Sequence, residues 1–588
     1  MNDSTNNETS TVSGLTRRGA MKGALLAGAT ACASPAPKMT PFTAAPSRAT
    51  EVFRHGVASG DPDAASVVLW TRVTPADAGA GPIEVRWEIA ADDSFSSLAA
   101  SGAAVTSAAR DWTVKALAEG LEPGRVYAYR FIALGGASPV GRTKTLPRGP
   151  VDVARFAVMS CSNYPFGYFN VYDQVGRRDD LDAILHLGDY IYEYGPNGYG
   201  AEVGERLGRP HAPTREILSL ADYRERHAQY KSDPSAQAMH AAAPMISIWD
   251  DHETTNNSWK DGAENHQPET EGDWTMRRRA ALQAYYEWMP VRDPKPGRSA
   301  ESLFSSYDYG DLLTLVSLET RLMARARQFE YSEVVPTLKS DADVANFRDN
   351  ILWDASRDMM GQAQLDYMSN AFSRAANAKR PWRLVANQVI MANVIAPDLS
   401  EYVTEEDIIS LEKQWNQARA FVEFSKLGLP VNLDAWDGYP AARERFYEMA
   451  KATQAEGMIV VTGDTHTWWA NDLAARDGQT MGVELGVTSV TSPSPYRPEF
   501  LGGKGSEYAL LTNRENPSVR YLSGASHGYI DLEVRPEGAA ARFMAVDTIE
   551  SRDYNAFQQA AFKIEKSKDG AAQFDAAKGV SFQEQWLF

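Results

Sequence analysis

The sequence is poor in cysteine: its 588 residues contain two, Cys32 and Cys161. Cys32 lies in an N-terminal segment that we expect to be removed, so the mature chain would carry one thiol and could form no internal disulfide. A lone thiol in an oxidising compartment is a liability unless it is buried or binds a metal. Cys161 is therefore either a small buried apolar residue or a metal ligand.

Positive charge is also in the minority, and long apolar runs are missing. The chain has 59 Lys and Arg against 77 Asp and Glu, a formal net charge of -18. This excess of negative charge argues against a general nucleic-acid-binding surface. The apolar run at residues 23–33 is too short for a permanent membrane anchor, and no other run is long enough to cross a membrane. The length predicts two or more domains.

Residues 1–40 have the pattern of an export signal. Arg17 and Arg18 precede the apolar, small-residue run from Gly23 to Ala33. Paired arginines followed by such a run are typical of twin-arginine signals, so we expect the twin-arginine export machinery as a partner and a periplasmic or secreted location. Cleavage near Ala33 fits the small-residue rule. A lipid anchor on Cys32 is the alternative, although the residues before it make a poor lipobox.

The next segment, residues 50–148, has the alternating pattern of β-strands separated by turns. Residues 66–72, 83–89 and 126–131 alternate in this way, and the segment from Leu121 to Tyr129 resembles the tyrosine corner of fibronectin type III and immunoglobulin-like domains. We expect a small β-sandwich here, joined to the next domain by a hinge at residues 147–150.

From Ala154 onward, apolar strands alternate with helical stretches, as in an α/β domain. We assign residues 151–550 to this catalytic domain and residues 551–588 to a C-terminal helical tail, with a helix near 555–568. Five of the apolar runs end in side chains that can bind metals. They are Cys161; Asp189 with Tyr192; Asp251 with His252; Asn387 with Gln388; and Asp464 with His466.

Ligands bind at the carboxyl ends of strands in open α/β sheets, so five such endings predict one shared site. The residue types supply two adjacent metal positions. Thiolate, phenolate and imidazole suit iron, while the oxygen-rich set suits calcium or another hard divalent ion. Asp189 could bridge the two positions. His186, inside an apolar strand, is expected to be a core histidine instead.

The order of these motifs resembles the calcineurin-like and purple-acid-phosphatase-type metallophosphoesterases. More narrowly, the chain resembles the PhoD family of alkaline phosphatases and phosphodiesterases. The narrower match rests on residues 53–62, 160–163, 186–192, 249–253, 319–321 and 463–466. The resemblance implies an α/β fold in which two sheets form an αββα sandwich behind the N-terminal β-sandwich.

The resemblance also implies a ligand set. A ferric ion would be held by Cys161, Asp189, Tyr192 and His466. One or two calcium ions would be held by Asp189, Asp251, Asn387 and Asp464. Asp251 and His252 would be the catalytic pair, with His252 beside the substrate phosphate.

Three points stay open in that set. Gln388 could replace Asn387, a second calcium could recruit Asn257 or Glu253, and Glu319 stands where the family pattern has aspartate.

We therefore expect an exported, metal-dependent hydrolase that acts on phosphomonoesters and phosphodiesters with a metal-activated hydroxide. The substrate would be a small phosphoester, with a phospholipid or polymeric diester as further candidates. The alternatives are a phospholipase D-type activity on lipid head groups and an exported binding module without activity. A serine hydrolase at Gly524–Gly528 is disfavoured, because the residues after this motif alternate as a strand and the nucleophile elbow needs a helix there.

Overall fold

The computed structural model describes residues 51–575, apart from residue 78 and residues 414–416. The twin-arginine signal, Cys32 and the last residues of the tail lie outside this part of the chain. In the described part, no helix is both long enough and apolar enough to span a membrane.

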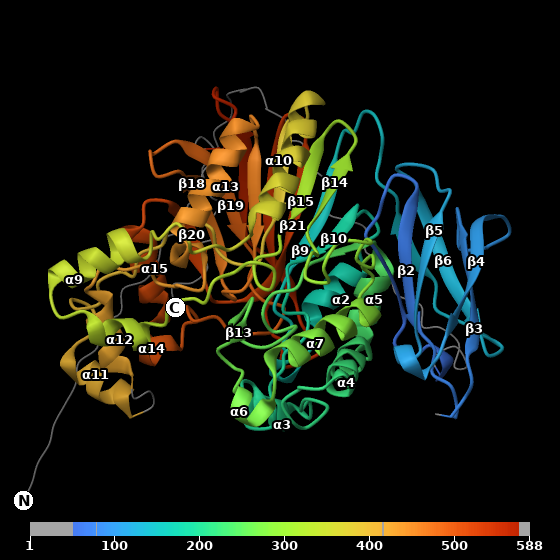
Figure 1. The fold of residues 1–588 in the computed structure, drawn as a ribbon, viewed down its shortest axis with the longest axis horizontal. Helices are drawn as coiled ribbons and strands as arrows, with labels where there is room; N and C mark the ends of the chain where they lie inside the picture. The colour runs from blue at the N-terminus through green and yellow to red at the C-terminus, as the bar shows by residue number, and fades with distance from the viewer. Residues whose placement is uncertain (1–50, 78, 414–416, 576–588) are drawn as a thin grey trace, which may run out of the picture. The chain divides into compact units, whose positions relative to one another are not determined.

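Two mixed sheets form the centre of the fold (Figure 1). The first has ten strands, in the order β24, β23, β22, β21, β9, β10, β11, β1, β2 and β5. Its middle strands β9, β10 and β11 are parallel to one another. In sheet order the bounds are Ala572–Phe574, Ala556–Lys566, Gly538–Val546, His527–Arg535, Ala154–Met159, Ala183–His186, Met245–Ser247, Val57–Gly60, Ser66–Arg72 and Thr113–Glu119.

The second sheet has seven strands, in the order β14, β15, β16, β17, β19, β18 and β20. Strands β15, β16, β17 and β19 are parallel, and β14 pairs antiparallel with β15 at one edge. In sheet order the bounds are Ser305–Tyr309, Leu313–Ser317, Trp382–Ala386, Met458–Thr462, Thr480–Gly486, Trp468–Ala474 and Val519–Ser523. Strands β18, β19 and β20 were not anticipated from the sequence.

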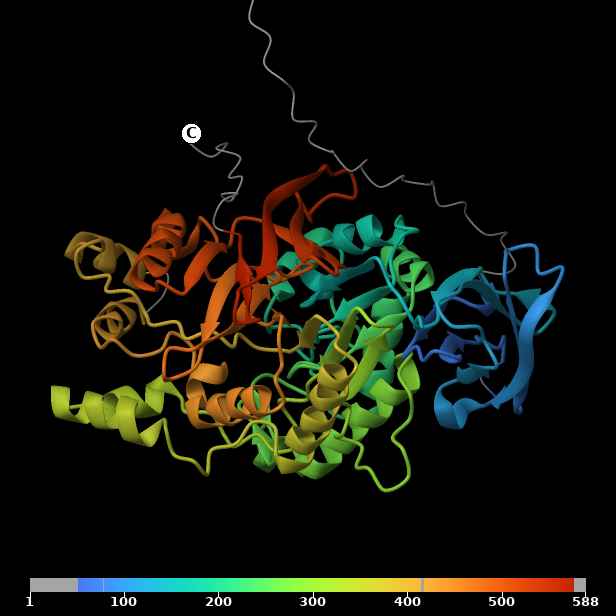
Figure 2. The ribbon, with the colours of Figure 1, turned by 90° about the horizontal axis from the view of Figure 1, so that it is seen from above.

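Apolar side chains of both sheets meet in one buried cluster that includes Phe156, Leu185, Leu315 and Leu384. The parallel strands are apolar on both faces because each sheet is also covered by helices. Figure 2 shows helices on both outer sides of the strands. The α/β class is thus confirmed, and the two sheets pack face to face as expected.

The helices on the first sheet share a second buried cluster with it. They are α2 (Asn170–Gly176), α4 (Leu220–Lys231), α5 (Pro234–Ala242) and α7 (Trp274–Trp288). The expected helices at 169–178 and 276–289 correspond to α2 and α7.

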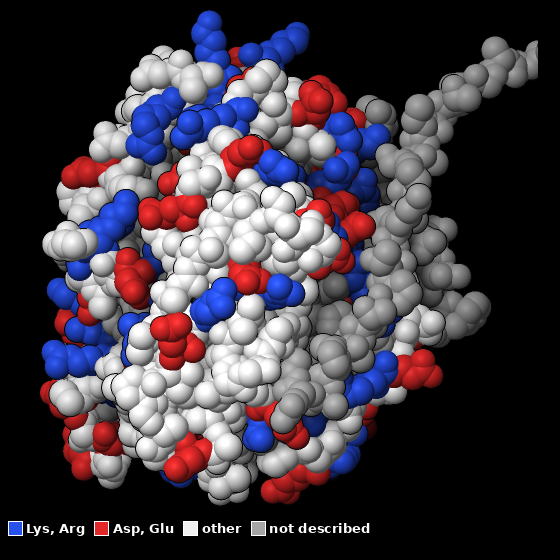
Figure 3. All heavy atoms as spheres, turned by 90° about the vertical axis from the view of Figure 1, so that its right-hand side faces the viewer, with Lys and Arg blue, Asp and Glu red and all other residues white. Residues whose placement is uncertain are grey.

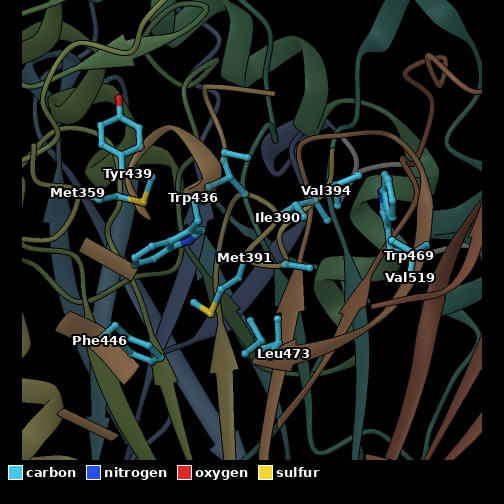
Figure 4. Packing of buried hydrophobic residues seen from close by; sticks show 14 of the residues in the cluster. Met359, Ile390, Met391, Val394, Trp436, Tyr439, Phe446, Trp469, Leu473 and Val519 are labelled. Atoms are coloured by element: carbon cyan, nitrogen blue, oxygen red, sulfur yellow. The ribbon is translucent and has the colours of Figure 1, made fainter. Parts of the chain in front are cut away.

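The second sheet is covered by α10 (Gln362–Asn377) and α13 (Pro440–Ala452). Figure 4 shows Trp436, Phe446 and Met391 in the packed layer between this sheet and its helices. The other helices and one short hairpin lie in the connections. They are α3 (Ala201–Leu207), α6 (Pro268–Glu271), α8 (Tyr331–Val334), α9 (Asp341–Asn346), α11 (Glu405–Glu412), α12 (Ala418–Ser425), α14 (Phe500–Gly503) and α15 (Gly505–Glu515), with the hairpin of β12 (Ser258–Trp259) and β13 (Gly262–Ala263).

The N-terminal strands do not form a free-standing sandwich. Strands β3 (Ile83–Ala90), β4 (Leu98–Thr106), β6 (Val126–Ala133), β7 (Gly136–Ala137) and β8 (Gly141–Lys144) make a separate five-stranded sheet. It packs on β2 and β5, which belong to the first sheet of the catalytic region. Strand β1 links the two regions, because its Gly60 pairs with Met245 of β11. The tyrosine-corner contact itself is present: the Glu122 N–H donates to the Tyr127 hydroxyl at 2.9 Å.

The expected C-terminal helix is wrong. Residues 556–566 form strand β23, which pairs antiparallel with β22 and with β24. Ala560, Phe562 and Ile564 are buried at every second position, the period of a strand. Ala, Gln, Glu and Lys give this segment helix propensity, but burial against β22 overrides it.

Candidate metal centre

Five parallel strands end beside one another and bring the metal-capable side chains to one end of the two sheets. Strands β9, β10 and β11 of the first sheet lead to Cys161, Asp189 and Asp251, and β16 and β17 of the second lead to Asn387 and Asp464. Hydrogen bonds tie these ends together. The Gln388 amide donates to the Trp249 carbonyl at 3.0 Å, and the Gly463 N–H donates to the Gln388 carbonyl at 2.7 Å.

One cluster combines a thiol, a carboxyl group, a phenol and an imidazole. Single ligand atoms of Cys161, Asp189 and His466 lie within 4.8 Å of one another. The Tyr192 hydroxyl donates to Asp189 Oδ2 at 3.1 Å and lies 3.3 Å from His466 Nε2. Cys161 Sγ is 3.5 Å from the same carboxylate oxygen. These are the four residues expected to hold iron, and the fold brings all four together.

The backbone at this cluster is held in an uncommon conformation. Cys161, Asp189, Asp464 and His466 have φ values of 61°, 55°, 65° and 53°, the left-handed region that side chains other than glycine seldom occupy. Each such residue costs about 1–3 kcal/mol, and residues of this kind concentrate at functional sites. Four of them around one cluster indicate that the ligand geometry, rather than folding stability, determines the shape of these loops.

Oxygen donors form two further clusters beside the first. Carboxylates of Asp250, Asp251 and Asp464 lie within 4.8 Å of one another, and Asp189 and Asp251 form a similar group with His252. Asp189 therefore belongs to both the mixed cluster and an oxygen-rich one, as a bridging ligand would. Asp250 is absent from the expected ligand set, but its carboxylate lies close to those of Asp251 and Asp464.

A buried arginine contacts the oxygen-rich side. Arg321 Nε donates to Asp250 Oδ1 at 2.5 Å, and its Nη1 donates to Asp434 at 2.7 and 2.8 Å. Its Nη2 is 3.5 Å from Asp464. Glu319 positions this arginine, because its carboxylate accepts the N–H groups of Arg321, Leu322 and Met323. The glutamate in place of the family's aspartate is therefore a loop-shaping residue.

The structure separates the roles of Asn387 and Gln388. The Gln388 amide nitrogen donates to two backbone carbonyls, and its oxygen accepts a hydrogen bond from Thr320 Oγ1 at 2.8 Å. All of its polar atoms are engaged in holding strand ends. Asn387 donates from its amide nitrogen to the Val389 carbonyl, while its oxygen has only a long contact of 3.4 Å from Trp436. Its oxygen is therefore the freer donor for a metal.

Glu253 and Asn257 also have partners. The Glu253 carboxylate accepts the N–H groups of Asp189, Tyr190 and Asp250, and so fixes two ligand loops relative to each other. The Asn257 amide donates to Glu264, and its N–H donates to Asp251 at 2.6 Å. Glu253 is thus a structural carboxylate at the base of the site.

His252 is held by the carboxylate of Glu193, a residue for which the sequence predicts no role. His252 Nδ1 is 2.6 Å from Glu193 Oε2, and its ring stacks on that of Tyr192 with centroids 4.2 Å apart. Burial lowers the pKa of His252, but the charges of Glu193, Asp251 and Asp189 outweigh burial and raise it well above 6.5. The neighbouring carboxylates thus favour the protonated form of the imidazole, the form that can donate a proton.

The cluster carries more buried acid than its own cations can neutralise. Burial raises the pKa of the Asp189 and Asp464 carboxyl groups and of the Cys161 thiol well above their usual values. Burial also lowers the pKa of His466 to about 3, and its Nδ1 is 3.1 Å from the Pro493 carbonyl, which leaves Nε2 as a neutral donor. These acids are difficult to ionise unless a cation lies beside them, and the neighbouring imidazole is neutral. Both properties are those expected of side chains that bind a metal ion.

A loop after β19 supports the mixed cluster and was not anticipated. Ser492 Oγ donates to the Tyr192 hydroxyl at 2.8 Å, and the Thr491 N–H donates to the Cys161 carbonyl at 3.3 Å. The run of Ser, Thr and Pro at 488–494 has no feature in sequence that separates it from an ordinary loop. Glu193 did have a signal, because it follows Tyr192 directly.

Comparisons with known proteins place the chain in a family. The family model described as PhoD-like phosphatase matches residues 156–543, and the model of its N-terminal domain matches residues 37–147. The chain belongs to the PhoD-like phosphatase family. It is 32% identical over 543 residues to alkaline phosphatase D of Bacillus subtilis (strain 168), a match that covers 90% of this chain and 83% of the relative.

A solved structure has a similar overall fold. The structure described as "Structure of PhoD" superposes with a TM-score of 0.73 at 30% identity, covering 92% of this chain and 95% of the other. The protein is therefore a phosphatase, an enzyme that hydrolyses phosphoesters, and it carries candidate metal-binding clusters.

Proposed function

We propose that this phosphatase binds a ferric ion through Cys161, Asp189, Tyr192 and His466, and one or two calcium ions through Asp189, Asp251, Asn387 and Asp464. The observation that carries the proposal is the buried thiol, carboxyl, phenol and imidazole within ligand distance of one another. Thiolate and phenolate with imidazole favour iron, and an all-oxygen set favours calcium.

The bound ions would polarise the phosphoryl group and acidify a water molecule for attack on phosphorus. The residues of this chain would position the metal ligands and protonate the leaving group. His252, held by Glu193, donates a proton to the leaving oxygen of the ester. Glu253 and Glu319 accept hydrogen bonds from the loops that follow the strands and so hold these loops in place. The ligand oxygens would then keep their positions during hydrolysis of the ester.

The test is to purify the protein with its metals and to record its visible absorption, its metal content and its rate on a phosphomonoester. We expect a coloured protein, because ferric phenolate and thiolate bonds absorb visible light. Cys161→Ser should lose the colour, the iron and at least 100-fold in kcat. Ser526→Ala, in the motif that resembles a nucleophile elbow, should change none of them. A colourless wild type, or a fully active Cys161→Ser enzyme without iron, would contradict the iron assignment.

A substrate panel tests the scope of the reaction. Phosphomonoesters and phosphodiesters are the proposed substrates, and phospholipid head groups are included as competitors. Ranking kcat/KM over the panel decides among them. No hydrolysis of any phosphoester with iron and calcium supplied would overturn the whole proposal.

Export through the twin-arginine pathway is part of the proposal. It rests on Arg17 and Arg18 before the apolar run at residues 23–33. Replacing both arginines with lysine should leave the full-length protein inside the cell, while Lys22→Arg should not. An unchanged distribution in the double-lysine variant would rule out this route.

A further inference from the structure

A cleft of about 470 Å³ lies beside the edge strand β14, between α10 and the first residues after β1. It is lined by residues of the loop 292–303 and of the segment 146–149 as well. The cleft is separate from the metal centre. None of the candidate metal ligands is among the residues that line it.

Six basic and four acidic side chains line the cleft, an excess of two positive charges in a chain with net charge -18. Three of the four acids are engaged with other side chains. Asp293 pairs with Lys115 at 2.5 Å, Asp308 pairs with Arg380 at 3.2 Å, and Asp61 accepts the Tyr307 hydroxyl at 2.6 Å. Figure 3 shows that basic side chains also gather along the upper edge of the face on the N-terminal side.

Two of the basic side chains in the cleft, Arg298 and Arg374, have no acidic partner in the described part of the chain. Within the described part of the chain, no carboxylate lies within 4 Å of the guanidinium nitrogens of Arg298 or Arg374. Arg298 lies over the Phe304 ring at 4.1 Å and near the Tyr367 ring at 5.5 Å, which fixes its position and leaves most of its donors unused. Arg298 is half-buried and Arg374 is exposed. A half-buried cation such as Arg298, which has no carboxylate partner, is stabilised when an anion binds beside it.

Two hydroxyl groups join these arginines in one constellation. Ser306 Oγ accepts a hydrogen bond from Arg374 Nη2 at 3.2 Å and lies 3.1 Å from the Tyr367 hydroxyl. Phe304 and Tyr367 pack edge to face at 5.1 Å, so the aromatic base of the site is rigid. Two guanidinium groups, a serine and a tyrosine in one cleft form a donor-rich pocket that has the geometry for an oxyanion with several acceptor atoms.

We propose that this cleft is a second phosphate-binding site, built by Arg298, Arg374, Ser306 and Tyr367 and separate from the metal centre. Its ligand is a phosphate group, either as the free ion that the enzyme releases or on an organic molecule. Because the cleft also contacts the segment after β1, its occupancy would stabilise the junction between the N-terminal strands and the second sheet.

The test is a calorimetric titration of the full-length, metal-loaded protein with inorganic phosphate. Wild type should bind two phosphates per chain, and the Arg298→Gln/Arg374→Gln double variant should bind one. The variant should keep kcat/KM for a small phosphomonoester within twofold of wild type. The control is Arg142→Gln/Arg279→Gln, which removes the same charge from two exposed arginines outside the cleft and should still bind two.

An equal number of bound phosphates in wild type and in the cleft variant would overturn the proposal. If the arginine variant does not fold, Ser306→Ala/Tyr367→Phe replaces it and should weaken the second binding event at least tenfold. Titration with a non-hydrolysable alkyl phosphonate distinguishes the two possible ligands, the free phosphate ion and a phosphorylated organic molecule. Tighter binding of inorganic phosphate supports the free ion, and tighter binding of the phosphonate supports a phosphorylated molecule. The difference of one bound phosphate between wild type and the cleft variant, both at the same metal loading, does not depend on which metals the enzyme holds, so this test and the iron test can fail separately.

Discussion

At the scale of single residues, Glu193 shows how a side chain outside the predicted ligand set can control the site. Its carboxylate accepts hydrogen bonds from Thr255, Asn256 and Asn265 on one oxygen and holds His252 with the other. Hydrogen bonds of this kind orient a side chain, and the loss of such partners around metal sites typically lowers metal affinity or activity about 10- to 100-fold. Glu193 is therefore a positioning residue for His252.

Glu193→Gln should lower kcat about 10- to 100-fold, with KM nearly unchanged, because His252 loses the charge that keeps it protonated and aligned. Steady-state kinetics on a phosphomonoester measure this. Glu484→Gln is the matched control, since Glu484 is equally buried and accepts two backbone N–H groups elsewhere in the second sheet. Equal kcat values in wild type and Glu193→Gln would show that His252 needs no such partner.

Lys231 has a buried amine whose effect on the free energy of unfolding depends on pH. It is 1% exposed, its Nζ is 2.8 Å from His240 Nε2, and it lies over the rings of Trp70 and Tyr190. No carboxylate pairs with it in the described residues, and burial lowers its pKa well below 10.5. The unfolded chain thus binds a proton at Lys231 that the folded chain does not. Lys231 therefore contributes an increase in the free energy of unfolding as the pH rises towards about 10.5.

Lys231→Met should raise the free energy of unfolding at pH 7 by about 1–3 kcal/mol, because it removes an amine buried without an ion partner. The gain should shrink as the pH rises through 10.5, because above this pH the wild-type amine is neutral in both states. Denaturant titrations at several pH values measure it. Lys563→Met, on the exposed side of β23, should give no pH-dependent difference. A constant difference for Lys231→Met at all pH values would contradict this account.

At the scale of elements, the turn between β10 and Asp189 sets the spacing of two ligand loops. Gly188 has φ of +104°, and a Cβ added there would lie 2.3 Å from the Asp250 backbone nitrogen. No side chain fits this position without moving the Asp250 loop, so the glycine permits the close approach of β10 and β11 at their carboxyl ends.

Gly188→Ala should lower kcat at least 100-fold, because displacements of about 1 Å in a site of this kind cost that much. Kinetics and metal analysis of the purified variant measure the effect. Gly120→Ala is the control: this glycine also has positive φ, of +77°, but no atom lies within 4 Å of the added Cβ. The control should lose about 1–2 kcal/mol of stability and keep its activity. If Gly188→Ala is as active as the control, the loop spacing is not critical.

The elements also show which features the sequence can and cannot predict. Cys161, Asp189, Asp251 and Asp464 were predictable because each follows an apolar run, and parallel strands bring such ends together. The β23 strand was not, because its residues favour a helix and only pairing with the distant β22 makes it a strand. Asp434 and the loop at 488–494 reach the site from loops without a local pattern, so only the tertiary fold reveals them.

At the scale of the whole molecule, the candidate metal centre lies where the two sheets meet. Cys161, Asp189 and Asp251 follow strands of the first sheet, while Asp464 and His466 follow a strand of the second. Buried carboxylates from the two sides repel one another across this junction. A cation at their meeting point would hold the two sheets together, so metal binding should contribute to the stability of the folded state as well as to catalysis.

Removal of the metals should therefore lower the unfolding temperature and the activity together. A ligand bound only by the folded state adds about 2.7 kcal/mol at 100 times its dissociation constant and about 4.1 kcal/mol at 1,000 times. Calorimetric scans of chelated and metal-loaded protein at the same pH measure the shift. Asp189→Ala, which removes the bridging carboxylate, should unfold at nearly the same temperature with and without metal, because it keeps neither position intact. Equal unfolding temperatures for chelated and loaded wild type would mean that the sheet junction is stable without a cation.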